Sequence, residues 1–499
     1  MATTAVEQPV APGPEEQEAS QGGLSLRGAL KLLLSSGTGK AGVAVFVVLI
    51  ALSIYVLVTY PLQYGQQRWS NPAVWADNPK AAPPAWTTWL GNDAFVNTSM
   101  TESKPSSVQE RGPAIVRTFS FPVTISNDTP PSFLSMTLTG ITYHTRPSVI
   151  SASLVRPDGG VVALAALAVR SPLPGETAPY KRYYDEPNRV LLNEQDNVAQ
   201  NLQATYQQVY PNLTLPTNLA TNTMQGLFGR PAANNSGQIE PLKGKYQLNV
   251  NIAVADKTDE IAPIHVVYGG TVFGVMGTDS IGRNIWEGLL YGVPIALLIA
   301  TLTALFSTLI GASLGILSGY AGGVTDGVIQ RLCDILSNVP TLPLLIFLVF
   351  ILGSHLYLII LVLIAFGWPG LTILVRSMVL QIRSGQLVEA AQALGASRTR
   401  IMTRHIFPQV APFIVAQMIF FAPGAILAEA ALSFLGLGDP SIPTWGQMLE
   451  QGFQTGALYV GYWWWVVPPG VAIVFTALAF MLLALAMEPV VDPRLRQVS

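Results

Sequence analysis

The chain has 499 residues, of which 50% are hydrophobic and only 11% are charged, and its formal net charge is −2. A soluble domain carries about 25% charged residues, so we expect much of this chain to lie in lipid. The near-neutral charge excludes a general attraction to nucleic acid. The single cysteine, Cys333, excludes an intrachain disulfide framework, and the four histidines lack the spacing of zinc ligands, so we expect no metal site.

The N-terminal part of the chain predicts a tail followed by a first membrane span. Residues 1–23 are rich in Pro and Glu and predict a disordered cytoplasmic tail. In the segment 24–60, residues 24–35 fit either a helix in the membrane interface or an extension of the span. Residues 41–60 are uncharged and about 30 Å long as a helix, which matches the bilayer core. A signal peptide is disfavoured, because the run is long and no small-residue cleavage site follows.

The segment 61–272 differs in character, with charges, Pro and Asn and no stretch long enough to cross a bilayer. Apolar residues at every second position predict half-buried strands. These alternating stretches are 119–125, 136–138 and 246–254. Turn residues between two apolar runs at 154–164 predict a hairpin. We expect an inserted β-rich domain over about 90–270, a β-sandwich, with a polar middle near 180–235 that is partly helical or irregular.

Long apolar runs resume in the segment 273–487, which we interpret as the core of a polytopic all-α membrane protein. Together with the first span they predict six transmembrane helices. Proline inside them is tolerated because neighbouring helices satisfy the freed backbone groups. The five further spans are expected at 291–316, 338–353, 356–376, 411–433 and 463–486. Residues 488–499 then form a C-terminal tail.

The distribution of basic residues predicts the orientation in the membrane. Six spans place both termini on one side, and every Lys and Arg outside 61–287 falls on that side. Basic loops stay in the cytoplasm, whereas long domains cross regardless of charge. We therefore expect a multi-pass protein of the plasma membrane with cytoplasmic termini and a mainly extracellular 61–287 segment. The basic residues counted are Arg27, Lys31, Lys40, Arg331, Arg376, Arg383, Arg398, Arg400, Arg404, Arg494 and Arg496.

Four N-x-S/T sequons all fall inside the expected extracellular segment. They are candidate glycosylation sites, and their confinement to this segment agrees with its expected side of the membrane. The residues are Asn97, Asn127, Asn212 and Asn234.

Several short motifs follow in the C-terminal half. The first, MGTDSIGRNIWEGLLYG at 276–292, contains Gly277, Thr278, Asp279, Gly282 and Arg283. Taken alone, its aspartate could simply cap a helix.

The second motif is GYAGGVTDGVIQRLCDIL at 319–336, in which Gly322 and Gly323 predict a tight turn before a helix that carries Asp326. On that helix Arg331 precedes Asp334 by three residues, so the two share a face and could form a surface pair worth about 0.5 kcal/mol.

The third motif, EAAQALGASRTRIMTRHIFP at 389–408, is a charged segment between two apolar runs and must lie in water. Gly395 allows the backbone to turn between two short helices. Small alanines would let the first helix press into a groove of a partner, and charged residues would fix its orientation. An ordinary amphipathic cytoplasmic loop is the alternative. The candidate residues are Glu389, Ala390, Ala391, Gly395, Arg398, Arg400, Arg404 and Pro408.

Two more motifs complete the series: SFLGLGDPSIPTWGQML at 433–449 and VVDPRLR at 490–496. In this order the motifs resemble those of the permease subunits of dipeptide, oligopeptide and nickel ABC importers, and 389–408 resembles their EAA loop. The resemblance covers nearly all of 273–499 and also fits the first span, but the β-rich segment has no counterpart. Asn284, Phe407 and the Asp439-Pro440 pair depart from the family pattern.

The resemblance implies a type I-like ABC permease fold, in the second, C-type permease subunit. It implies as partners a second homologous permease, two cytoplasmic ATPases docked on the EAA loops, and an extracellular substrate-binding protein. The substrate would be a peptide, an oligosaccharide or nickel. The chain itself would be no enzyme and would hold no cofactor, because ATP and Mg²⁺ would be bound by the ATPases. In agreement, SGTGKAG at 36–42 lacks the first Gly and the final Ser/Thr of a phosphate-binding loop.

Glu429 is an ionisable residue inside an expected span and hence a candidate for the translocation pathway. Its place near the outer end equally fits a carboxylate used in helix packing. Two other classes of protein stay open: a membrane-anchored receptor or enzyme that acts through the extracellular domain, and a secondary transporter or channel. Copurification of ATPases would exclude both.

Overall fold

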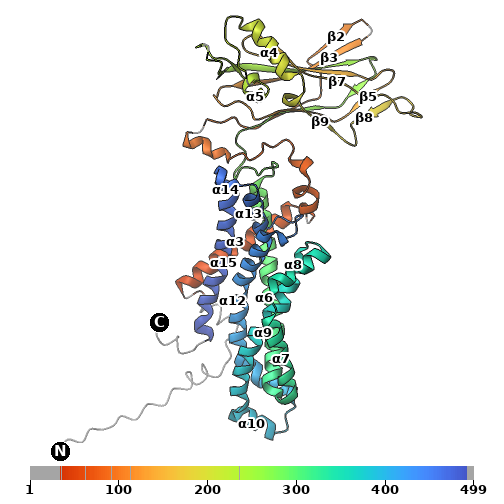
Figure 1. The fold of residues 1–499 in the computed structure, drawn as a ribbon. Coiled ribbons are helices and arrows are strands. Elements are labelled where there is room, and N and C mark those ends of the chain that lie inside the picture. Colours follow the sequence, from red (N-terminus) through yellow and green to blue (C-terminus); the bar gives the residue numbers. More distant parts are fainter. Residues whose placement is uncertain are drawn as a thin grey trace, which may run out of the picture. The chain divides into compact units, whose positions relative to one another are not determined.

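The computed structural model describes residues 34, 36–61, 63–91, 93–112, 114–217, 219–234 and 236–491. The expectations for the tail 1–23, for nearly all of the interfacial helix 24–35 and for residues 492–499 lie outside them. The chain divides into two compact units (Figure 1). The helical unit comprises residues up to Ser70, Glu287–Gln454 and those from Val466. The β-rich unit comprises Asn71–Trp286 and Thr455–Trp465.

Long apolar helices build the helical unit. Within the described residues, five stretches are long and apolar enough to cross a membrane. They are Gly37–Thr59 (α3), Ile285–Ala321 (α6), Leu356–Arg383 (α9), Arg398–Leu437, which contains α12 (Phe407–Leu432), and Trp463–Met487 within α15 (Trp463–Val491). They cover the expected spans at 41–60, 291–316, 356–376, 411–433 and 463–486.

The expected span at 338–353 differs. Here α7 (Gly323–Asn338) and α8 (Thr341–Leu352) meet at an angle of 78°, and only the pair taken together would count as a sixth span. Pro340 explains the break, because proline disfavours helical backbone at the residue before it, and Val339 is extended. With 12 residues, α8 is only about 18 Å long, less than the bilayer core.

A glycine stripe lets α6 and α9 pack closely. Gly311, Gly315 and Gly319 face α9, and a Cβ at Gly315 would lie only 2.8 Å from the Cβ of Val375 and 2.9 Å from the carbonyl oxygen of Thr372. The Thr372 hydroxyl donates to the carbonyl of Gly311 at 3.1 Å. Small residues at such spacing bring helix backbones together in membranes. The contact holds α6 against the last turns of α9, from which the loop described below extends.

The β-rich unit contains two larger antiparallel sheets. The five-stranded sheet has the order β2 (Ser107–Arg111), β3 (Ala114–Ile125), β12 (Gly244–Val254), β6 (Val149–Val155) and β7 (Val161–Ala168). The four-stranded sheet has the order β1 (Thr98–Glu102), β14 (Ile264–Tyr268), β4 (Leu134–Leu138) and β9 (Asn188–Leu191). The alternating stretches lie in β3, β4 and β12, and the predicted hairpin is β6–β7, so these predictions are confirmed.

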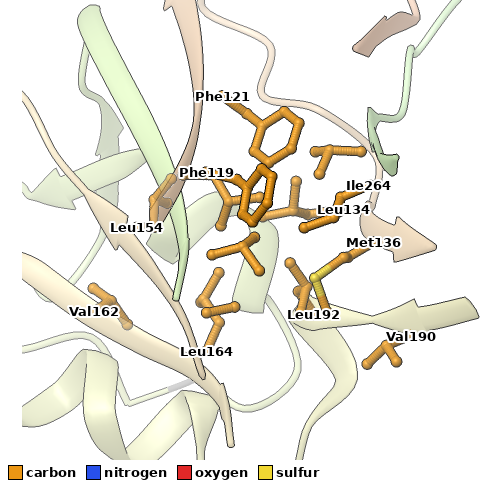
Figure 2. Packing of buried hydrophobic residues seen from close by; sticks show 14 of the residues in the cluster. Phe119, Phe121, Leu134, Met136, Leu154, Val162, Leu164, Val190, Leu192 and Ile264 are labelled. Carbon is orange, nitrogen blue, oxygen red and sulfur yellow. The ribbon is translucent and has the colours of Figure 1, made fainter. Parts of the chain in front are cut away.

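Both sheets contribute to one buried hydrophobic cluster. Figure 2 shows Phe119 and Phe121 of β3 converging with Leu134 and Met136 of β4, and with Ile264 of β14. Because successive side chains of a strand point to opposite faces, the alternation places these residues on the inner face of each sheet.

Short elements fill the polar middle of the β-rich unit. Helix α4 (Val198–Val209) contributes Leu202 and Tyr206 to the same cluster, and α5 (Thr223–Leu227) contributes Leu227. A three-stranded sheet consists of β13 (Glu260–Ile261), β5 (Ile141–Tyr143) and β8 (Tyr180–Arg182), and a two-stranded one of β10 (Gly229–Pro231) and β11 (Ile239–Pro241). The expectation of partly helical structure near 180–235 is therefore confirmed.

The β-rich unit extends beyond the boundary expected at residue 272. Its compact part runs to Trp286 and includes 455–465, because these segments bind the stretch that follows the first span. The amide of Phe273 donates to the carbonyl of Pro83 at 2.8 Å, and the amide of Ala85 donates to Gly274 at 2.9 Å. We call residues 71–97, 271–286 and 455–465 the collar. It contains the 3₁₀-helices η2 (Pro72–Trp75) and η3 (Ala85–Leu90) and the short helix α14 (Ala457–Val460).

Candidate functional site

A charged loop of two short helices follows α9. It consists of α10 (Gln386–Ala393), α11 (Arg398–Ile401) and the π-helical turn η5 (Met402–Ile406), and it leads directly into α12. We call residues 386–406 the two-helix loop. Within the helical unit α10 lies at the end of the bundle formed by α6, α9 and α12, at the bottom of Figure 1.

Gly395 separates the two helices. Its φ is +76°, a left-handed conformation that costs other residues about 1–2 kcal/mol. The amide of Ala396 donates to the carbonyl of Ala391 at 3.0 Å, and that of Gly395 to the carbonyl of Gln392 at 2.9 Å. This pair of bonds is a Schellman motif, which ends α10 and satisfies its last carbonyls. The side chain of Ser397 then caps α11 by accepting from the amide of Arg400. The helix break predicted at Gly395 is present.

One face of the two-helix loop is buried. Val388, Ala391, Ile401 and Ile406 join a hydrophobic cluster with residues of α6 and α9. The members from those helices include Ile316, Tyr320, Val375 and Val379. Because these apolar side chains are in contact with one another, displacement of the loop should also displace the ends of α6 and α9.

The opposite face is exposed and partly apolar. Leu394 is 89% exposed and Leu387 is 56% exposed. These residues lie seven positions apart, on one side of α10. Sequence reasoning missed both, although their spacing was a usable signal. Of the two alanines expected to meet a partner, Ala391 is buried and Ala390 is exposed. The other candidate residues with exposed side chains are Glu389, Arg398, Arg400, Arg404 and Pro408.

A polar cavity of about 340 Å³ lies between the two-helix loop and the ends of α6 and α9. Arg383 and Arg398 supply positive charge on its walls, and Gln392 supplies an amide. Such a cavity can accept an acidic or polar group from a partner protein. The other lining residues are Tyr320, Ala321, Ala396 and Ile401.

An ion pair joins α7 to α9 close to the start of the loop. Asp326 accepts two hydrogen bonds from Arg376, both at 2.6 Å, and another from the hydroxyl of Ser318 on α6. The surface pair expected between Arg331 and Asp334 is not formed: both residues are described and exposed, and no ion pair links them. Arg376 is 50 positions from Asp326 in sequence, so helical spacing could not reveal this pair.

The glycines before α7 form the expected turn. Gly322 and Gly323 have φ values of +65° and +55°, which only glycine adopts readily. Gly322 lies against Arg383, whose Nη1 would be 3.0 Å from an added Cβ. The turn between α6 and α7 is thus packed against the residue with which α9 ends.

Glu429 is buried near the end of α12. The hydroxyl of Ser433, one turn later, donates to its Oε1 at 2.6 Å. Ser433 also lies 3.5 Å from the hydroxyl of Thr444, just before α13 (Trp445–Gln454), and α13 packs so closely that a Cβ at Gly446 would lie 2.7 Å from the carbonyl of Ala430. The geometry favours the helix-packing interpretation over a pathway residue.

The motif at 277–283 lies in the collar. The Thr278 hydroxyl donates to the carbonyl of Pro79 at 2.6 Å and accepts from the amide of Ala82 at 2.9 Å. Buried Asp279 accepts from the amide and the guanidinium of Arg283. Gly277 and Gly282, with φ values of +71° and +90°, lie close to the carbonyls of Ala82 and Trp75. These residues therefore tie the β-rich unit together.

Asn284, which differs from the aspartate usual in the family motif, still caps the start of α6. Asn284 precedes α6, and its Oδ1 accepts from the amide of Trp286 at 3.1 Å. Asn and Asp are equally good N-cap residues, so the helix start is retained.

The four sequon asparagines differ in accessibility. The side-chain amide of Asn97 donates to the carbonyl of Asp77 at 3.3 Å, and that of Asn127 donates to the carbonyl of Ala94. Asn212 and Asn234 are exposed, and Asn234 only accepts a bond, from the amide of Ser236. A glycan requires a free amide nitrogen, so the geometry favours Asn212 and Asn234.

Comparisons with known proteins give a consistent assignment. The family model described as "Binding-protein-dependent transport system inner membrane component" matches residues 311–497. The dipeptide transport system permease protein DppC of Escherichia coli (strain K12) is 42% identical over 239 residues, 48% of this chain and 78% of that protein. DppC of Bacillus subtilis (strain 168) is 36% identical over 222 residues, which are 44% of this chain and 69% of that protein.

Two further similarities were found. The oligopeptide transport system permease protein OppC of Bacillus subtilis (strain 168) is 35% identical over 222 residues, 44% of this chain and 72% of that protein. A chain of a solved inward-facing structure of the MetNI methionine ABC transporter is 22% identical, and the match covers 43% of this chain and 97% of that chain. The TM-score of 0.33 is too low to establish a common fold.

Proposed function

Because this chain belongs to the family of inner membrane components of binding-protein-dependent transport systems, we propose that it forms half of the translocation pathway of an ATP-driven importer for peptides. It is a membrane permease subunit of such an importer. The observation that carries the choice of substrate is the 42% identity to a dipeptide permease over 78% of that relative's length. An oligosaccharide is the other substrate class that the sequence resemblance allows.

The two-helix loop is the proposed docking site for an ATPase. Exposed Leu387 and Leu394 would enter an apolar groove, and Arg398, Arg400 and Arg404 would meet acidic groups around it. Burial of Val388 and Ile401 against α6 and α9 would convert movement of the docked ATPase into movement of the spans. Partner subunits would bind and hydrolyse the ATP, and the chain itself would need no cofactor.

We further propose the remaining features of the importer. Two ATPases, a second homologous permease and a substrate-binding protein complete it. If the bent α7–α8 pair is one span, the chain has six spans, so both termini would lie on one side, which we take to be the cytoplasm. Residues 61–287 are then extracellular, and the two sheets that share one core form a sandwich-type domain. The basic residues of the two-helix loop support this orientation.

Copurification tests the docking. The tagged chain would be coexpressed with the subunits encoded beside its gene and purified in mild detergent. We expect an ATPase to accompany the wild-type chain, and Leu394→Glu to lose it while the thermal unfolding temperature stays unchanged, since Leu394 is 89% exposed. Val324→Glu, at an 84% exposed position at the start of α7 and outside the loop, is the matched control and should retain the ATPase. Retention of the ATPase by Leu394→Glu would contradict the docking site.

Uptake tests the substrate. Proteoliposomes that contain the assembled importer should accumulate labelled peptide when ATP is present on the ATPase side. If they accumulate an oligosaccharide and no peptide, the substrate class is wrong although the transport function stands.

A receptor is the second candidate, favoured by one observation. The β-rich unit has a polar pocket of about 600 Å³ lined by Asn193, Glu194, Gln195 and Asp196 and by residues 220–225. Binding of a ligand there, in a chain that purifies without any ATPase, would favour the receptor.

A further inference from the structure

The collar exposes large apolar side chains that nothing described above uses. In η3, Trp89 is 87% exposed and Leu90 is 74% exposed, and in α14 Tyr459 is 85% exposed. Their neighbours Leu458 and Val460 are exposed as well. Contiguous exposed apolar surface marks a binding site for a protein or a membrane, whereas single exposed residues need no explanation.

Specific contacts join η3 to the start of α15. The ring of Trp86, within η3, lies 5.7 Å from that of Trp463, the first residue of α15. The indole of Trp86 donates to the carbonyl of Val275 at 2.9 Å, and the indole of Trp464 donates to the carbonyl of Thr278 at 3.2 Å. The collar therefore holds η3 beside the residues at which the last span begins.

Helix α14 lies next to the same point. The amide of Tyr462 donates to the carbonyl of Ala457 at 2.8 Å, and that of Trp463 to Gly461 at 2.9 Å. Gly456 and Gly461, with φ values of +70° and +87°, bound α14 and turn the chain back toward Trp463. Both η3 and α14 are therefore held next to residues 462–463, where α15 begins.

The position of α15 indicates what covers this surface. A span of 25 residues is about 37 Å long, more than the bilayer core, and its first residue, Trp463, is 40% exposed and of a type that favours the headgroup region. Trp86 touches Trp463, and Trp89 follows Trp86 by one 3₁₀ turn, about 6 Å. Tryptophan and tyrosine favour this interface, because their rings are apolar and their N–H or O–H groups remain hydrated.

We propose that Trp89, Leu90 and the exposed face of α14 insert into the headgroup region of the bilayer and hold the collar at the membrane surface. The partner is a lipid surface, recognised through apolar contact alone, since Trp89, Leu90, Leu458, Tyr459 and Val460 carry no charge. Zwitterionic lipid should therefore suffice, and added salt should not release the contact. The inference rests on the proposed function only in that α15 is taken as a membrane span.

Site-specific fluorescence quenching by lipid tests the proposal. The full chain, with the partner subunits that copurify, would be reconstituted in phosphatidylcholine nanodiscs that carry nitroxide groups at the headgroup or deep in the acyl chain. A polarity-sensitive dye would be attached at Leu90→Cys or Tyr459→Cys. Native Cys333 is fully buried and would be replaced in the Cys333→Ala background. We expect a blue-shifted emission and quenching that is strongest with the headgroup nitroxide.

Two control positions separate this proposal from the assignment of α15. Val474→Cys, on an exposed residue in the middle of α15, reports on the span and should be quenched by the deep nitroxide. Val161→Cys, on an exposed valine of β7, should not be quenched. If position 474 is quenched and position 90 is not, the collar does not contact lipid and its apolar surface serves a protein partner. If position 474 is also unquenched, the membrane placement of α15 itself is wrong.

A charge substitution tests the physical cause. Trp89→Asp should abolish the blue shift and the quenching at position 90, because a charged side chain resists transfer into the interface. Val161→Asp, on a residue of comparable exposure, should leave the signal at position 90 unchanged. Equal quenching at position 90 with and without Trp89→Asp would overturn the role given to Trp89.

Discussion

Arg376 donates Nε and Nη2 to the two carboxylate oxygens of Asp326, each at 2.6 Å, and thereby joins α9 to α7. Ser318 of α6 donates to the same carboxylate, so three helices meet at one acid. Because α9 leads into the two-helix loop, this junction lies between the proposed ATPase contact and the bent α7–α8 pair.

Arg376→Lys should weaken this junction, although the positive charge is kept. An ammonium cannot reproduce the bidentate geometry, and the loss of a charged hydrogen bond costs about 1.5–3 kcal/mol. We expect a lower thermal unfolding temperature in detergent, measured by scanning fluorimetry. Arg331→Lys, at an exposed position of α7, serves as control and should have no effect. Equal unfolding temperatures for the Arg376 variant and the wild type would show that the bidentate geometry contributes nothing to stability.

Gly395→Pro should uncouple ATP hydrolysis from transport. Proline cannot adopt a φ of +76°, and it removes the amide that donates to Gln392. Hydrolysis should then continue without substrate uptake in proteoliposomes. Gly395→Asn is the matched control, because asparagine tolerates the left-handed region, and it should retain uptake. Normal uptake by the proline variant would contradict the coupling role of the loop.

Gly315→Ala should destabilise the helical unit through its contact with α9. The added Cβ would lie 2.8 Å from Val375 and 2.9 Å from a backbone carbonyl, so a helix must shift, at a cost of about 1–3 kcal/mol. Gly370→Ala, in α9, meets no atom within 4 Å and should be neutral or slightly stabilising. The thermal unfolding temperatures of the two variants in the same detergent would be compared, and an equal effect would exclude a close α6–α9 contact at Gly315.

The β-rich unit should lose stability in acid through Asp158. Burial raises the pKa of this carboxyl, but hydrogen bonds and the charge of Arg156 outweigh burial and hold the pKa below its usual value. The unfolded pKa is about 3.9, so the contribution is present above about pH 4 and is lost as pH falls through the lower folded pKa. Thermal unfolding between pH 3 and 6 should show a steeper acid loss for the wild type than for Asp158→Asn. The exposed variant Asp185→Asn should behave as the wild type.

We expect glycans at only two of the four sequons. In a glycosylating host, Asn212→Gln and Asn234→Gln should each remove one glycan from the purified chain, as read by intact mass. Asn97→Gln and Asn127→Gln should leave the number of attached glycans unchanged, because both side-chain amides already donate to backbone carbonyls. Complete absence of glycans from all four positions would remove this support for an extracellular β-rich unit.

Features that depend on neighbours in sequence could be predicted from the sequence. The alternation that defines β3, β4 and β12, the hairpin β6–β7 and the break at Gly395 all follow from local backbone preference and side-chain period. The apolar runs likewise located five of the six expected spans, since helix length and hydropathy are local quantities.

The contacts between side chains that lie far apart in the sequence could not be predicted in this way. Asp326 forms an ion pair with Arg376 of a different helix. Helical spacing in the sequence indicated a pair between Arg331 and Asp334 instead. Ala390 and Ala391 are identical in type, yet only packing against α6 and α9 determines that Ala391 faces inward. By its family resemblance the motif at 277–283 indicates the start of a span. Its hydrogen bonds to residues 79–82 make it part of the β-rich unit instead.

The sequence by itself determined the membrane class, the family resemblance and the position of the two-helix loop, because composition, hydropathy and motif spacing are properties of the chain. Only the tertiary structure decided which face of that loop is exposed, which cation pairs with Asp326, and that Trp86 lies beside Trp463 at the start of α15. Those relationships join residues far apart in sequence, and they are set by side-chain packing and hydrogen bonding in three dimensions, which local patterns do not encode.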